Sequence, residues 1–173
     1  MNIFATDPNP VLSAVALDDK RIVKMALESA QMLSSAIRLT VPTPDEHLYR
    51  NTHQHHPCSV WSRKNLHNFL WLYDHGKALC AEYTHRYERR HKSEDIIDLA
   101  YNHLEVFGDP FPELSSETVF DFNSSGWIVG DVFHSYRLCM MQKWLDKDSR
   151  PPRWTHRDKP EWYLPIRLEY EDL

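Results

Sequence analysis

The side chains with the clearest chemical potential lie between residues 18 and 28. Lys20, Lys24 and Glu28 are spaced by four residues, so on a helix they share one face and come within reach of one another. Arg21 precedes Glu28 by two helical turns and lies on roughly the same side. A carboxylate flanked by fixed cations stays ionised at neutral pH, and it can stabilise a developing positive charge or orient a water molecule. The alternative is a solvated face with an ordinary Lys24–Glu28 ion pair, which contributes little to stability.

A second group combines histidine, cysteine and tryptophan. Residues 53–58 hold three His and Cys58, which suggests a zinc site. The spacings typical of zinc ligands are missing, however, and no second Cys/His pair follows, so we predict no metal. His53 and His56 lie near the start of a predicted helix, and there they are suited to hydrogen-bond a phosphate or another polar ligand. Trp61 joins them as a candidate for substrate contact.

The segment 149–163 interleaves five basic residues with three aromatic ones. Cations that meet phosphates and rings that stack on bases are the components of a nucleic-acid groove. The alternative is a proline-rich strap that packs Trp154 and Trp162 onto the helices. Upstream, Glu82 and Arg86 lie one helical turn apart and form either a plain intrahelical ion pair or a substrate contact. The candidates for substrate contact in this part of the chain are Glu82, Arg86, Arg137, Arg157, Trp162 and Tyr163.

Apolar residues at three- and four-residue steps predict the helices that position these groups. The predicted helices run from about residue 17 to 39, from Pro57 to Tyr87, from 94 to 107 and from about 131 to 145. The expected non-helical segments are an extended lead-in over 1–10, an irregular stretch over 111–130 and the proline-rich 149–163. We therefore predict an all-α fold, a compact helical bundle with a long irregular C-terminal segment, as a single domain over residues 1–173.

Composition narrows the class of protein. At 173 residues the chain suits one domain. The chain has only four glycines and no glycine-rich phosphate motif, which excludes Rossmann and P-loop nucleotide sites. A net charge of −5 excludes a globally basic nucleic-acid binder but not a local basic patch. Three widely spaced cysteines predict reduced core thiols. Because the sequence shows neither a signal peptide nor a membrane span, we expect a cytoplasmic protein with no membrane partner.

Four motifs carry a resemblance to a known family. They are Asp-Lys-Arg-Ile-Val-Lys-Met-Ala-Leu-Glu ending at Glu28, Thr-His-x-x-His-Pro-Cys-x-x-Trp ending at Trp61, Leu-Cys-Ala-Glu-Tyr-Thr-His-Arg-Tyr ending at Tyr87, and Trp-Thr-x-Arg-x-x-Pro-x-Trp-Tyr ending at Tyr163. Together they resemble small phage-encoded proteins grouped with the pyrimidine dimer DNA glycosylases of the phage endonuclease V type. A phage-encoded protein of this kind would act in the cytoplasm of the host cell.

The resemblance implies a compact all-α enzyme in which the N-terminal α-amine attacks the sugar carbon of a damaged nucleotide. A glutamate on the first long helix assists, seven residues after a basic histidine. The matching positions here hold Glu28 and Arg21. The family's aromatic C-terminal segment, which lies against DNA, corresponds to Trp162 and Tyr163.

This chain departs from that family pattern at several positions: Arg21 replaces the histidine, Leu27 and Gln31 stand near Glu28 where the family has arginines, and the most serious departure is at position 2. The family has a small second residue, so that the initiator methionine is removed, whereas this chain has the bulky Asn2 and is expected to keep Met1. An α-amine is partly neutral, and hence nucleophilic, near pH 7. The attacking amine is then that of Met1, or that of a lysine such as Lys20 or Lys24. We predict Glu28, Met1 and Lys24 as the catalytic residues, with Lys20 and Arg21 engaging phosphate or substrate.

The resulting hypothesis is a DNA-base-directed enzyme, a glycosylase or glycosylase/lyase acting on damaged or modified pyrimidines. It needs no cofactor, and its partner is DNA or a modified nucleotide. Two alternatives remain open: a transferase that modifies thymines of phage DNA, and a non-catalytic helical protein that binds a host protein or a nucleotide as a counter-defence factor. The sequence makes no prediction of the oligomeric state.

Overall fold

A computed structural model describes residues 1–104, 130–145 and 151–163. These residues contain helices and no strand. The helices are α1 (Pro10–Val15), α2 (Asp19–Thr40), α3 (Pro57–Ser62), α4 (Leu66–Tyr87), α5 (Glu94–Asn102) and α6 (Val132–Leu145). The predicted all-α fold is therefore confirmed. The third predicted helix, expected over 94–107, is shorter in the structure, since α5 ends at Asn102 with His103 as its C-cap. The stretch 111–129 and Phe107 lie outside the described residues.

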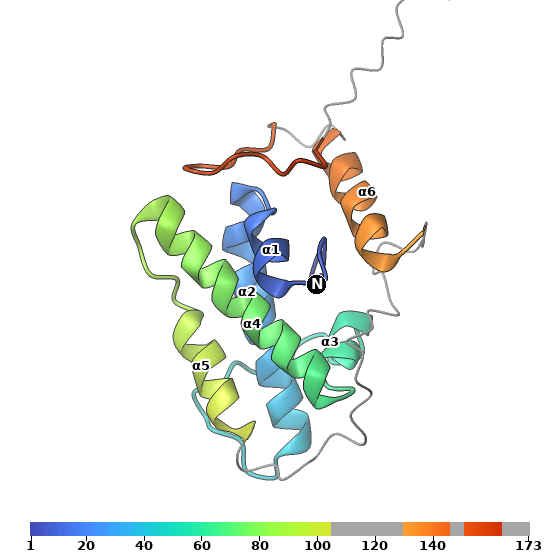
Figure 1. The fold of residues 1–173 in the computed structure, drawn as a ribbon. Helices are drawn as coiled ribbons and strands as arrows, with labels where there is room; N and C mark the ends of the chain where they lie inside the picture. The colour runs from blue at the N-terminus through green and yellow to red at the C-terminus, as the bar shows by residue number, and fades with distance from the viewer. Residues whose placement is uncertain (105–129, 146–150, 164–173) are drawn as a thin grey trace, which may run out of the picture.

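The two long helices, α2 and α4, form the centre of the bundle, with α1 against α4 and α5 against both long helices (Figure 1). The apolar stripe predicted for the first long helix is buried, as Ile22, Met25 and Leu33 illustrate with exposures of 2% or less. From α4, Phe69 and Leu79 meet this stripe in the core. A row of apolar side chains at helical spacing thus fixes which face of α2 points inward, and it leaves the adjoining face to the residues of the site.

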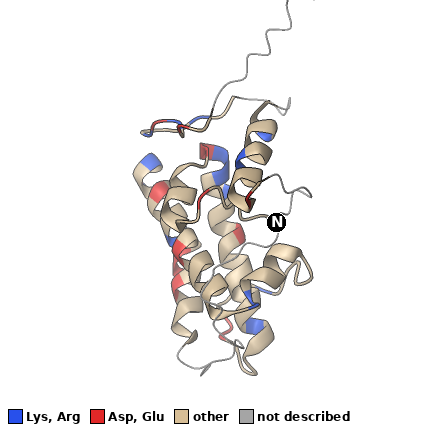
Figure 2. Cartoon of the chain, turned by 45° about the vertical axis from the view of Figure 1, so that its right-hand side comes forward, with Lys and Arg blue, Asp and Glu red and all other residues tan. Residues whose placement is uncertain are grey.

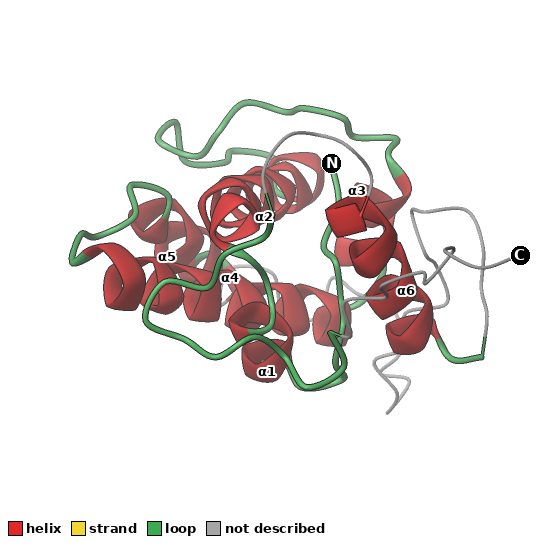
Figure 3. Ribbon diagram, turned by 90° about the horizontal axis from the view of Figure 1, so that it is seen from above, coloured by secondary structure: helices red, strands yellow, loops and turns green. Residues whose placement is uncertain are grey.

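One predicted helix is divided in the structure. The segment from Pro57 to Tyr87 was expected to be continuous, but it breaks between α3 and α4. The side-chain oxygen of Asn65 accepts the Asn68 backbone N–H at 2.8 Å, and the Asn68 amide donates to the Trp61 carbonyl at 2.9 Å. Asparagine favours the N-cap position because its side chain satisfies an N–H at the helix start. As a result α3 turns toward the N-terminus of the chain (Figure 3).

A short helix was missed within the first twenty residues. Asn9 caps α1 by accepting the N–H groups of Val11 and Leu12, and Pro10 occupies the first turn. The signal for this helix, a capping residue followed by proline, is present in the sequence. The segment from Met1 to Asn9 is non-helical, but it is not the extended lead-in that was expected over 1–10, because a turn held by Asn2 folds its first residues and α1 begins at Pro10.

Helix α6 lies beside the N-terminal segment, and it was predicted within one residue of its observed start. Tyr136 meets the Phe4 ring edge-on at 6.4 Å, and Arg137 donates to the Thr6 carbonyl at 2.7 Å. The described part of the proline-rich segment, residues 151–163, has no helix, as expected, and is called the strap below. It runs across the ends of α2 and α4 (Figure 1).

Two further sequence expectations concern thiols and membranes. Cys58, Cys80 and Cys139 are all buried as reduced thiols, which confirms the prediction. Burial raises the pKa of the Cys80 thiol to about 12, so it is not a nucleophile at neutral pH. Among the described helices, none combines the length and the apolar character needed to cross a bilayer.

His75 should make the stability of the fold depend on pH. It is fully buried between α4 and α1, and burial lowers its pKa to about 4. Between pH 6.5 and 4 the unfolded chain binds a proton that the folded chain does not, so stability falls as the pH falls, by about 3 kcal/mol in total. Urea unfolding of the wild type should show this loss of stability at low pH, and His75→Gln should show only a small part of it. Equal pH slopes for the two proteins would contradict the assignment, and His55→Gln, on the surface, is the control.

Candidate active site

The carboxylate of Glu28 is buried although it is charged. Its residue is 8% exposed. One oxygen accepts the backbone N–H of Asn2 at 2.8 Å, and the other lies 3.3 Å from the ammonium of Lys24. Glu28 is therefore not part of a solvated face. Its partners compensate the buried charge and place the carboxylate directly at the start of the chain.

The first residues form a tight turn held by the side chain of Asn2. Its oxygen accepts the N–H groups of Ile3 at 2.7 Å and Phe4 at 3.0 Å. Phe4 has φ +54°, a left-handed conformation that costs a residue with a Cβ about 1–2 kcal/mol. Tertiary contacts hold it there: Ser13 donates to the Phe4 carbonyl at 3.3 Å, and the Arg21 guanidinium lies 5.9 Å from the Phe4 ring. The path of the chain start is thus fixed from several sides.

Met1 is packed into this arrangement by its side chain. The side chain lies partly buried against the core, and its sulfur accepts a hydrogen bond from the Ser59 hydroxyl at 3.3 Å. Ser59 belongs to α3, whereas Glu28 belongs to α2. The break before α4 therefore matters to the site, because it lets α3 reach the chain start.

His56 completes the group of residues around the amine. It caps α3, with its Nδ1 accepting the Cys58 N–H at 3.2 Å. Burial lowers the pKa of His56, the positive N-terminal amine and His53 lower it further, and Glu28 opposes the shift. These electrostatic interactions couple His56 to Glu28 and to the amine. They keep the imidazole neutral at pH 7, and because Nδ1 accepts a hydrogen bond, Nε2 carries the proton.

The other predicted residues of this region are placed less centrally. Lys20 is exposed, and the Lys24 side chain is 65% exposed although its ammonium contacts Glu28. Arg21 does not reach Glu28, because it pairs with Asp18 at 2.9 Å on the preceding turn. His53 is exposed with φ +48°. Of the predicted cations Lys20, Arg21 and Lys24, the structure therefore brings only Lys24 into contact with Glu28.

Trp61, Glu82 and Arg86 are buried, with exposures of 4%, 4% and 2%. Trp61 meets Trp71 edge-on in the core, with ring centroids 6.1 Å apart. Arg86 donates to the Leu17 and Val15 carbonyls, to Asp19 and to Glu82, all within 3.1 Å. Glu82 and Arg86 therefore belong to a network that links α4 to α1 and α2, whereas Trp61 packs in the core.

The same buried network anchors the strap. Arg157 binds Glu82 through two nitrogens, the shorter distance being 2.7 Å. The Thr155 N–H and hydroxyl both donate to Asp19, at 3.0 and 2.7 Å. The Trp154 indole donates to the Ala16 carbonyl at 3.0 Å. The strap is therefore fastened to the helices, as the packing interpretation expected, whereas contact with nucleic acid stays a prediction.

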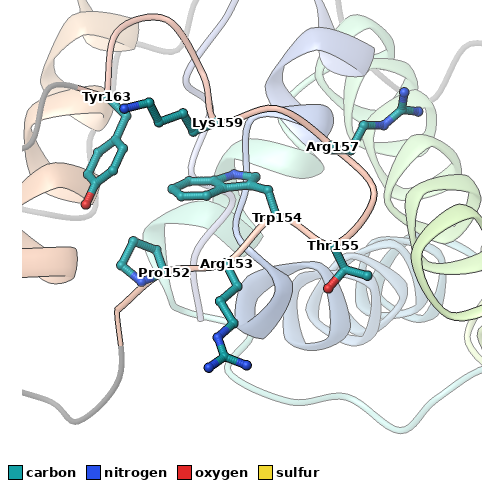
Figure 4. Close-up of a pocket in the computed structure, with 7 residues that line it drawn as sticks. All are labelled: Pro152, Arg153, Trp154, Thr155, Arg157, Lys159 and Tyr163. Atoms are coloured by element: carbon teal, nitrogen blue, oxygen red, sulfur yellow. The ribbon is translucent and has the colours of Figure 1, made fainter.

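A shallow hollow of about 500 Å³ opens on the strap. Figure 4 shows Trp154 at its centre, with Lys159 and Tyr163 to one side and Arg157 directed away from them. Beyond the hollow, Trp162 stacks on Trp144 of α6 at 5.5 Å, and Arg137 lies 6.0 Å from the Trp162 ring. The lining residues are Pro152, Arg153, Trp154, Thr155, Arg157, Lys159 and Tyr163.

The strap hollow lies at the same end of the molecule as the first turns of α2. Blue segments on the strap, on α2 and on α6 gather at this end in Figure 2. Asp19, which holds the strap, precedes Glu28 by nine residues on α2, about 14 Å along the helix axis. Cations of the strap, α2 and α6 therefore lie at one end of the molecule, where carboxylates are interspersed with them and pair with Arg21, Arg137 and Arg157.

Ser59 and Arg153 were not singled out from the sequence as site residues, and the turn that Asn2 forms was not predicted. Ser59 carries no pattern that marks it. Asn2 does carry one, because asparagine side chains accept N–H groups one or two residues ahead and thereby stabilise tight turns. Arg153 was counted among the basic residues of the strap, but only the fold shows that it lines the hollow.

The described residues form a small all-α fold in which a buried carboxylate lies at the chain start. Comparison with family models extends this: the model for pyrimidine dimer DNA glycosylase matches residues 1–95. The chain belongs to this family. The matched residues include Met1, Asn2, Glu28, His56 and Ser59, and end before α6 and the strap. Comparisons with curated proteins and with solved structures gave no match.

Proposed function

We propose that the chain is a DNA glycosylase/lyase that acts on damaged or modified pyrimidines. One observation carries the proposal: the buried Glu28 carboxylate accepts the first peptide N–H of the chain, that of Asn2, at 2.8 Å, and the Met1 amine belongs to the residue directly before it. Membership of the pyrimidine dimer DNA glycosylase family supports a reaction at this site. The small phage-encoded proteins that the sequence resembles suggest its setting, which is DNA in the cytoplasm of an infected cell.

In the proposed reaction the neutral Met1 amine attacks C1′ of the deoxyribose. The N–C1′ bond forms as the glycosidic bond breaks, and the electron pair of that bond leaves with the pyrimidine, which takes a proton from solvent. Transfer of a proton from the attached nitrogen to the ring oxygen opens the sugar to an iminium ion. Glu28 stabilises the positive charge at C1′ and on the nitrogen. Lys24, 3.3 Å from the same carboxylate, is the alternative amine.

The remaining residues of the site have supporting roles in this proposal. Neutral His56 offers its Nε2 proton to a phosphate or sugar oxygen, and exposed His53, Lys20 and Lys24 add donors nearby. On the strap, Arg153, Lys159 and Tyr163 present cations and a ring to the DNA backbone and bases. We leave Trp61, Glu82 and Arg86 out of the substrate contacts because they are buried.

Borohydride trapping tests the proposal. The protein is incubated with duplexes that contain a pyrimidine dimer, an abasic site or a modified thymine, with and without borohydride. We expect a covalent protein–DNA adduct and strand cleavage on at least one duplex, and peptide mapping then assigns the amine to Met1 or Lys24. Absence of adduct and cleavage on all three rejects the lyase. Nucleosides that gain mass without base release would indicate a transferase instead.

The salt dependence of binding tests the role of the strap. Neutralising Arg153 and Lys159 together, as Arg153→Gln/Lys159→Gln, should weaken duplex binding and lower the slope of log K against log[salt] by roughly 2, because each cation releases about one counterion. Fluorescence anisotropy at several salt concentrations measures the slope. Arg89→Gln/Lys92→Gln, a pair of exposed cations after α4, is the matched control. An unchanged slope in the strap variant would remove the strap from the interface.

A further inference from the structure

Asn2 stands at the second position of the chain in a network of short contacts. The backbone N–H of Asn2 donates to Glu28 at 2.8 Å, and its side-chain oxygen accepts from Ile3 at 2.7 Å and Phe4 at 3.0 Å. One residue therefore contacts the carboxylate and also closes the turn that follows. No other residue of the described chain start makes both kinds of contact.

Met1 is built into the same arrangement. Its side chain packs against the core, and its sulfur accepts from Ser59 on α3. Removing Met1 would delete both contacts. The Asn2 nitrogen, which then becomes an amine, would lie against Glu28 itself. With Met1 present, an amide N–H occupies that place, and the amine lies one residue farther out, where its charge acts on His56.

We propose that Asn2 is a positioning residue for the amine of Met1, and that this site works with Met1 in place. The bulk of Asn2 keeps Met1 on the chain, and its side-chain oxygen fixes the turn that directs Met1 toward α3. Ser59 then holds the Met1 side chain and limits the rotation of the amine. This inference rests on the proposed function for its catalytic part, whereas the position of the amine can be measured without any substrate.

Two variants separate the roles of Asn2. Asn2→Asp keeps a side-chain oxygen that accepts from Ile3 and Phe4, and Asn2→Leu keeps the size but removes the acceptor. Both residues are bulky enough for Met1 to be retained, which intact mass measurement checks. Asn102→Leu, at an exposed position of α5, is the control for an added surface leucine. Thermal unfolding of the wild type and the three variants shows whether any variant has lost its fold.

Single-turnover base release gives the catalytic test. We expect Asn2→Leu to lower the maximal rate about 10- to 100-fold with little change in KM, because a displaced nucleophile slows the chemical step and not substrate binding. Asn2→Asp should recover most of the rate. An Asn2→Leu rate equal to wild type overturns the inference, as does a wild-type protein that lacks Met1 and forms its adduct through Asn2.

Acetylation of the amine gives the test without substrate. Under limiting acetylating reagent, mass spectrometry follows modification of Met1, which we expect to be roughly tenfold faster in Asn2→Leu because two hydrogen bonds that hold the turn are lost. Asn2→Asp and Asn102→Leu should resemble wild type. If wild type forms no adduct on any duplex but shows this difference, the proposed function fails and the positioning role stands. Equal rates in all four proteins overturn the positioning role even if the enzyme is active.

Discussion

Glu28→Gln is expected to lower the rate of base release at least about 100-fold, with nearly unchanged stability. Glutamine has the shape of glutamate, and its side-chain oxygen can still accept the Asn2 N–H. It carries no negative charge, however, to stabilise the cationic sugar carbon and the iminium ion. The ion pair that is lost is with Lys24, whose side chain is 65% exposed, so its contribution to stability is small.

Single-turnover base release and urea unfolding measure the two halves of this prediction. Glu94→Gln is a matched control, because Glu94 also pairs with a lysine, Lys77 at 2.9 Å, but on α5 and away from the chain start. It should retain the wild-type rate. If Glu28→Gln releases base as fast as wild type, Glu28 is not the catalytic carboxylate. Both enzyme hypotheses, glycosylase and transferase, would then lose their central residue, whereas a non-catalytic binding protein would keep its activity.

The apolar pattern predicted the helices well because each long helix buries one continuous stripe. The stripe of α2, from Ile22 to Ile37, is buried residue for residue. The same pattern failed at residues 63–65, where a single capping asparagine, Asn65, starts a new helix. Periodicity cannot detect this break, since the apolar spacing continues across it and only a local hydrogen bond decides.

For the site, spacing predicted that Lys24 and Glu28 would meet but not that Glu28 would be buried. Burial comes from the chain start folding back across α2, a contact over 26 residues. Arg21 shows that helical spacing can also suggest a contact that does not form. Its spacing from Glu28 was suitable, yet Asp18 lies closer on the preceding turn and takes the guanidinium. Helical spacing gives the possible partners, and long-range packing selects among them.

The pair of Glu82 and Arg86 extends this argument to stability. Their separation predicted the intrahelical contact, which is observed at 3.1 Å. The sequence could not show that the Arg86 side chain would be fully buried, because its other acceptors come from residues 15–19. A buried guanidinium is tolerated only when its hydrogen bonds are satisfied, and here carbonyl and carboxylate oxygens from α4 and from residues 15–19 satisfy them.

Arg86→Ala should therefore destabilise the protein by about 3–5 kcal/mol, the cost typical of removing one partner from a buried charged network. It leaves the Leu17 and Val15 carbonyls without their donor and releases Asp19, which also holds Thr155 of the strap. Urea unfolding measures the loss, and limited proteolysis within residues 151–163 should become faster. Arg89→Ala, at an exposed position one turn later, should change stability by no more than about 0.5 kcal/mol. Similar stabilities for the two variants would mean that Arg86 does not hold α1, α2 and the strap together.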